Sequence, residues 1–217
     1  MANTNNKVIT DAAESLVSCL FEMAEANTNP VLQVIDPEIP LEENKKYPAA
    51  LLQFKQSGWR AYYHCHPASR AGNHRFHGEH GHFHFFAQLQ QQPELWSHLA
   101  ALAMDNMGQP LGWFTVNHWV AGENWASAEI LIKQLENISF PRYLAEKETH
   151  NKYALVEQWL LSFLVLSIDK IKTILEQRDK ILNQYQDEQP GKDVKADKEI
   201  YLLSEIPVNI GALLNIF

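Results

Sequence analysis

Histidine side chains are concentrated in one short stretch of the chain. It reads Arg75-Phe76-His77-Gly78-Glu79-His80-Gly81-His82-Phe83-His84-Phe85-Phe86 and contains four of the ten histidines. Toward its end, histidines alternate with apolar or small residues, which is typical of a half-buried β-strand because successive side chains point to opposite faces. Gly78 and Gly81 disfavour a helix, which would also align several of these histidines. We therefore predict a strand that carries His80, His82 and His84 on one face.

A second stretch, Ala61–Pro67, has the same period. Its aromatic residues favour a strand, and Pro67 is expected to end the pairing. Tyr62, His64 and His66 would then share one face. If the two stretches pair as antiparallel strands, two His-x-His units meet on one side of the sheet.

Strand geometry limits which histidines can bind one ion. Side chains at i and i+2 lie roughly 6.7 Å apart, and those at i and i+4 roughly 13 Å apart, whereas zinc binds imidazole nitrogen at about 2.0–2.1 Å. The predicted ligand set takes one His-x-His unit from each strand, namely His64, His66, His82 and His84. Glu79 and His80 are outer candidates, with Glu79 as a ligand or general base. Neutral imidazole suits zinc, iron, copper or nickel. The alternative is a polar sheet face whose histidines hydrogen-bond to neighbours or water.

Two arginines between the predicted strands suggest an anionic substrate. The connection Ala68–Gly78 is too long for a tight turn, and long loops in compact domains are often binding loops. Arg70 and Arg75 on it could hold a carboxylate or a phosphate; the alternative is an ordinary surface loop. Asn117, on a later strand, is a further candidate polar residue of the site.

Composition and charge set the broad class. The chain has 217 residues, of which 46% are hydrophobic and 20% charged, enough for one sizeable core and a single domain. Its net charge of −8 gives no reason to expect nucleic acid or an anionic membrane as a partner. The N-terminus lacks a signal peptide pattern, two cysteines are too few for a disulfide framework, and the apolar run Trp159–Ile168 is too short to span a bilayer. We expect a cytoplasmic protein.

The remaining patterns predict an α+β fold. An antiparallel sheet of about four strands is expected, because His98–Met104 and Leu111–Trp119 flank the turn sequence Asp105–Gln109 and extend the two histidine strands into a sheet over residues 60–119. Asn27–Tyr47 is expected to be irregular, and Pro48–Trp59 is ambiguous between a short helix and a lead-in to the first strand.

Helical periodicity occupies the two ends of the chain. We predict a helix over residues 10–26, a region of helices over 123–186, and a linker with a docking tail over 187–217. The helical region ends in one long amphipathic helix from about His150 to Gln186. This helix is expected to cover the sheet, to pair with the first helix, or to form a homodimer with its copy.

Two resemblances to known families follow from these motifs. The segment His80–Phe86 resembles the signature of histidine-triad nucleotide hydrolases and transferases, and this resemblance implies that the middle histidine, His82, attacks a nucleotide α-phosphate. It covers seven residues, and Gly81 stands where that pattern has an apolar residue. A longer resemblance, to a bacterial family of unknown function, implies an α+β protein with no assigned activity. It rests on Tyr62–Pro67, Glu79–His84, Asn117–Trp125, Trp159-Leu160 and Arg178-Asp179.

The sequence leaves three functions open. The first is a zinc- or iron-dependent hydrolase or oxygenase of a small acidic molecule, with the ion held by the histidines. The second is a triad-type nucleotide hydrolase or transferase with His82 as nucleophile. The third is a non-catalytic binding or assembly protein that forms a homodimer through its long helix.

Overall fold

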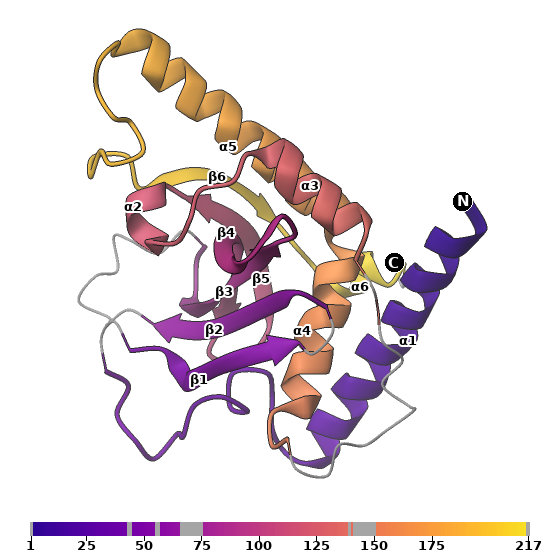
Figure 1. The fold of residues 1–217 in the computed structure, drawn as a ribbon. Coiled ribbons are helices and arrows are strands. Elements are labelled where there is room, and N and C mark those ends of the chain that lie inside the picture. Colours follow the sequence, from indigo (N-terminus) through magenta and orange to yellow (C-terminus); the bar gives the residue numbers. More distant parts are fainter. Residues whose placement is uncertain are drawn as a thin grey trace.

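Each strand of the sheet pairs with its neighbours in the sequence. The computed structural model describes residues 2–42, 45–54, 57–65, 76–138, 140 and 151–215. Within them lies one six-stranded sheet in the order β1-β2-β3-β4-β5-β6, with every pair antiparallel (Figure 1). The strands are β1 (Tyr47–Phe54), β2 (Trp59–Cys65), β3 (Glu79–Leu89), β4 (Gln92–Asp105), β5 (Pro110–Val116) and β6 (Leu202–Pro207). The α+β class is confirmed. The sheet has six strands, however, whereas about four were expected.

The two additional strands lie at the edges of the sheet. β1 comes from the stretch that was ambiguous in the sequence, and β6 comes from the docking tail. The hairpin between β4 and β5 is as predicted: Asp105 Oδ1 accepts the backbone N–H groups of Met107 and Gln109 at 2.9 and 2.7 Å. Gly108 supplies the left-handed conformation of this turn, with φ of 76°.

Several predicted element boundaries are wrong; β4, for example, begins at Gln92 rather than at His98. β5 ends at Val116 rather than Trp119, because Asn117 begins the short helix α2 (His118–Ala121) by accepting the His118 N–H. The N-terminal helix α1 spans Ala2–Glu25, longer than predicted. The predicted long helix is two helices, α4 (Ala154–Leu166) and α5 (Ile168–Glu188), which meet at Ser167. The helix α3 (Ala128–Glu136) lies where helical periodicity was expected, and α6 (Ile210–Leu213) is a single turn near the C-terminus.

The break at Ser167 lets the two helices pack differently. α4 is buried on nearly all sides between α1 and the sheet, and Gln158 on it donates a hydrogen bond to Ser15 of α1 at 2.7 Å. α5 is amphipathic and packs its apolar side on α3, β5 and β6. Ile171, Ile174 and Leu175 of α5 are fully buried within the chain. The apolar side of α5 is therefore used inside the fold and gives no support to a homodimer formed through this helix.

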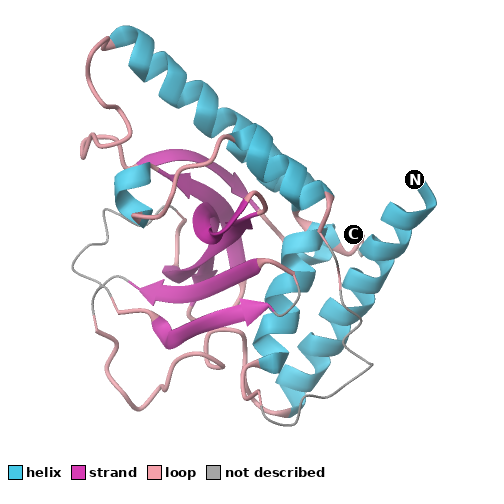
Figure 2. Cartoon of the chain, viewed as in Figure 1, coloured by secondary structure: helices cyan, strands magenta, loops and turns pink. Residues whose placement is uncertain are grey.

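The sheet separates a large core from a smaller cluster. The longer helices lie together along one side of the sheet (Figure 1, Figure 2), where they enclose Tyr63, Phe83, Phe85 and Trp113. The other face carries a smaller apolar cluster of Ala101, Ala103, Phe114 and Val116. None of the helices in the described part of the chain has the length and apolar character needed to cross a membrane.

A buried ion pair joins α5 to the start of α3. Arg178 is 2% exposed, and its guanidinium donates to Asp179 Oδ1 at 2.8 Å and to the Ala126 carbonyl oxygen at 2.8 Å. Asp179 Oδ2 accepts the backbone N–H of Ala128 at 2.6 Å, which satisfies one free donor of the α3 N-terminus. Burial lowers the pKa of Arg178, and the charge of Asp179 opposes that shift.

We predict that Asp179→Ala lowers the free energy of unfolding by about 3 kcal/mol, because it leaves a buried guanidinium without its carboxylate. Glu176→Ala removes an exposed carboxylate from the same helix and is expected to change stability by less than about 0.5 kcal/mol. Urea denaturation of both variants measures the difference. Equal stability of the two variants would show that the pair has no structural role.

Candidate metal centre

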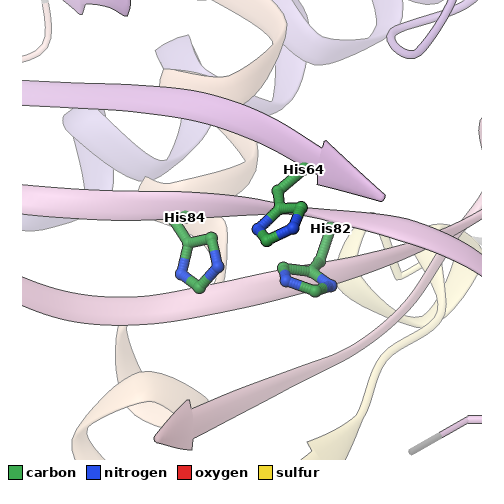
Figure 3. A group of neighbouring side chains, drawn as sticks. All are labelled: His64, His82 and His84. Carbon is green, nitrogen blue, oxygen red and sulfur yellow. The ribbon is translucent and has the colours of Figure 1, made fainter. Parts of the chain in front are cut away.

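Pairing between β2 and β3 brings three histidines to one point of the sheet. His64 and His82 are directly opposite each other in the antiparallel register, and His84 follows two residues along β3. The three rings lie on the same side of the sheet (Figure 3), with centroids 5.5 Å apart for His64 and His82, 6.0 Å for His64 and His84, and 4.7 Å for His82 and His84. The predicted convergence of histidines from two strands is present.

The distances between these rings suit a metal ion. One ring nitrogen from each histidine lies within 4.8 Å of the other two. In a tetrahedral zinc site, two ligand nitrogens are roughly 3.3 Å apart, so a bound ion would draw the three rings closer together. His82 is 1% exposed and His84 is 4% exposed. The cluster is therefore largely shielded from solvent and can hold an ion.

A β-bulge at the start of β3 changes which residues lie on the same face of the sheet as His82 and His84. Glu79 pairs with Asp105 and Gly81 with Met104, so His80 is the extra residue on β3. The bulge turns His80 to the opposite face, where its Nδ1 lies 2.7 Å from the Tyr63 hydroxyl. Glu79 moves onto the histidine face instead. The prediction that His80, His82 and His84 share one face is thus wrong, because His80 lies on the face opposite His82 and His84.

Outer partners orient two of the three rings. His82 Nδ1 lies 3.0 Å from Glu79 Oε1, and His84 Nδ1 lies 2.9 Å from His98 Nε2. A carboxylate can only accept, so His82 Nδ1 carries the proton and its Nε2 has the lone pair that a metal needs. Metal-binding histidines commonly donate their second N–H to such a carboxylate.

His98 orients the ring of His84 as Glu79 orients the ring of His82. Burial, with a smaller contribution from the charge of Arg178, lowers the pKa of His98 to about 3. His98 and Arg178 line the same small polar cavity of about 10 Å³. A neutral His98 can accept the proton of His84 Nδ1, which leaves the Nε2 lone pair of His84 for an ion.

Aromatic and small side chains surround the cluster. The ring of Phe114 packs edge-on against His82 with centroids 5.2 Å apart, and the ring of Tyr62 lies 5.1 Å from that of His84. Across the sheet, Ala103 pairs with His82 and Ala101 with His84. Burial raises the pKa of Tyr62 to about 12, so its phenol stays protonated and can donate a hydrogen bond.

The other predicted site residues lie elsewhere or outside the described residues. His66, Arg70 and Arg75 fall in the segment 66–75, which is outside the described residues. Asn117 is fully buried; its amide donates to the Val194 carbonyl oxygen at 2.8 Å, so its contacts are those of a residue that holds the C-terminal segment. Its predicted role in substrate binding has no contact to support it and stays a prediction.

Sequence reasoning missed His98, whose ring contacts that of His84. It did not connect His98 with the histidine strands, because the bulge between Phe85 and Phe86 that aligns His98 with Phe86 leaves no mark in the sequence pattern. It also treated Lys46 as part of an irregular connection, although this residue directly precedes β1.

Comparisons with known proteins add a family and no activity. Residues 10–208 match the model of a family described as Domain of unknown function (DUF6969). No curated protein and no solved structure matches the chain.

Gly81 is predicted to be essential for the bulge. A Cβ at this position would lie 2.5 Å from the His64 carbonyl oxygen and 2.5 Å from the Tyr63 hydroxyl, which crosses Gly81 to reach His80. Gly81→Ala should therefore lower the free energy of unfolding by about 1–3 kcal/mol. Tyr63→Phe removes only the hydroxyl and should lower the free energy of unfolding by about 1 kcal/mol.

The double variant Gly81→Ala/Tyr63→Phe is the control. It should remain less stable than Tyr63→Phe, since the His64 carbonyl oxygen still obstructs the added methyl group. Full recovery would contradict this account.

Proposed function

Since the chain belongs to the family described as Domain of unknown function (DUF6969), we propose its activity from the site itself: a zinc-dependent hydrolase of a small acidic molecule. The observation that carries the proposal is the convergence of His64, His82 and His84, whose ligand nitrogens lie within 4.8 Å of one another. Three neutral imidazoles with a fourth position left for water or substrate form the ligand set of catalytic zinc sites. Zinc at such a site lowers the pKa of its bound water to about 7 and so supplies hydroxide at neutral pH.

The ligand types favour zinc over iron. Oxygen-activating iron sites commonly combine two histidines with one carboxylate. In the described part of the chain, the carboxylate near the cluster is that of Glu79, and its Oε1 lies 3.0 Å from His82 Nδ1. Glu79 is therefore proposed as a positioning residue that holds the His82 ring and raises its basicity, in place of the general base or ligand suggested by the sequence.

The environment of the cluster supports a reaction at the ion. Phe114 and Tyr62 pack against the ligand rings, and Ala101 and Ala103 form a small-residue floor beside them. Apolar walls lower the local dielectric constant, and a lower dielectric constant strengthens the attraction between the ion and a developing negative charge.

We predict that untagged protein, purified without nickel or chelators, contains about one equivalent of zinc. His82→Ala should lose the ion, because it removes a buried ligand, while His77→Ala should retain it, because His77 is exposed in the turn before β3. Elemental analysis of the three proteins measures the metal content. A mixture of metals well below one equivalent in the wild-type protein, unchanged in His82→Ala, would refute the proposed centre.

Glu79→Gln is predicted to weaken zinc binding by about 10- to 100-fold, the range typical of lost outer partners of metal ligands. Glu94→Gln, a change of the same kind at an exposed position of β4, is the matched control and should leave the affinity unchanged. Competition with a zinc chelator gives the affinities of both variants. If Glu79→Gln bound zinc as tightly as Glu94→Gln, the positioning role of Glu79 would be excluded.

A further inference from the structure

A lysine lies next to the histidine cluster on the same face of the sheet. Lys46 directly precedes β1, whose first residue, Tyr47, pairs with Tyr63 of β2. In an antiparallel pair, the next position back on β1 lies beside the next position along β2, so Lys46 lies beside His64. Its ammonium group is 4.7 Å from the centroid of the Tyr62 ring, and that ring is 5.1 Å from the ring of His84.

Lys46 differs from the neighbouring basic residues in its contacts. Arg60 on the same face of β2 forms an ion pair with Glu123 at 2.6 Å and stacks on Trp96 at 4.2 Å. Lys45 forms an ion pair with Glu42. Among the residues that the structure describes, Lys46 has the Tyr62 ring as its contact and no acidic partner. Its positive charge is therefore available to a ligand at the cluster.

The charge balance of the centre favours an anion. Three neutral imidazoles leave the two positive charges of a zinc ion uncompensated, and Glu79 supplies one negative charge through His82. With Lys46 at the rim, the site retains a net positive charge. The phenol of Tyr62, whose ring lies against that of His84, adds a hydrogen-bond donor beside the cluster.

We infer that the site takes a small organic carboxylate, and that Lys46 binds the acid group between its ammonium and the metal ion. This inference rests on the proposed function, since it assumes an ion held by His64, His82 and His84. It assigns to Lys46 the part that the sequence suggested for Arg70 and Arg75, and it makes the negative charge of the substrate one determinant of specificity.

Cobalt(II), which binds the same nitrogen ligands, provides a spectroscopic probe of the centre. The cobalt-loaded full-length protein is titrated with benzoate and, separately, with uncharged benzamide, and the change in the visible cobalt bands gives the two affinities. The variant is Lys46→Gln, and the matched control is Lys45→Gln, which removes the same charge one residue earlier. We expect Lys46→Gln to weaken benzoate binding about fivefold, as for the loss of a partly exposed ionic contact, with benzamide binding and cobalt affinity unchanged. Lys45→Gln should behave as the wild-type protein.

The two proposals fail in different ways. If the wild-type protein binds no cobalt at the histidines, the metal centre is refuted and the substrate inference falls with it. If cobalt binds but benzoate does not perturb its spectrum, or binds equally well to the wild type and both lysine variants, the metal centre stands and the inference about Lys46 is overturned. An equal loss in Lys46→Gln and Lys45→Gln would assign the effect to net charge and would also overturn it.

Discussion

Burial of polar groups on the histidine face is the constraint on which this site depends. His82, His84 and Glu79 are at most 5% exposed, and a buried polar group without a partner costs roughly 1–3 kcal/mol. Contacts from Glu79 and His98 satisfy one nitrogen of two of the rings. In the proposed centre, a metal ion binds one nitrogen of each of the three rings. The contacts that stabilise this face would also hold the rings in position for the proposed cation.

The strands around the cluster maintain that arrangement in two ways. The β2–β3 register sets His64 opposite His82, and a shift of one residue would turn every side chain of β2 to the other face. The bulge at His80 brings Glu79 onto the face, and Gly81 leaves room for the Tyr63 hydroxyl that fixes the bulge. A rigid sheet with a large core behind it suits a site whose ligands must keep their positions to within a fraction of an ångström.

Local sequence patterns predicted which helices and strands form better than they predicted the residues at which these begin and end. The alternation of histidines identified β2 and β3 and their shared face, because period two is a direct consequence of the pleat. The bulge at His80 could not be foreseen, since one extra residue on a strand depends on its partner strand. The break at Ser167 was also missed, because no glycine or proline marks it; it follows from α4 packing against α1 while α5 packs along β5 and β6. The clustered histidines His64, His82 and His84 were among the predicted ligands, whereas the places of His98 and Lys46 required the register of the sheet.

Anomalous diffraction tests the central claim most directly. A crystal of zinc-saturated protein, measured on both sides of the zinc absorption edge, should show one strong peak at about 2.0–2.1 Å from a ring nitrogen of His64, His82 and His84. Glu79 and His98 should remain on the outer nitrogens of His82 and His84. A peak at other residues only, or no peak at this cluster in zinc-saturated crystals, would contradict the account.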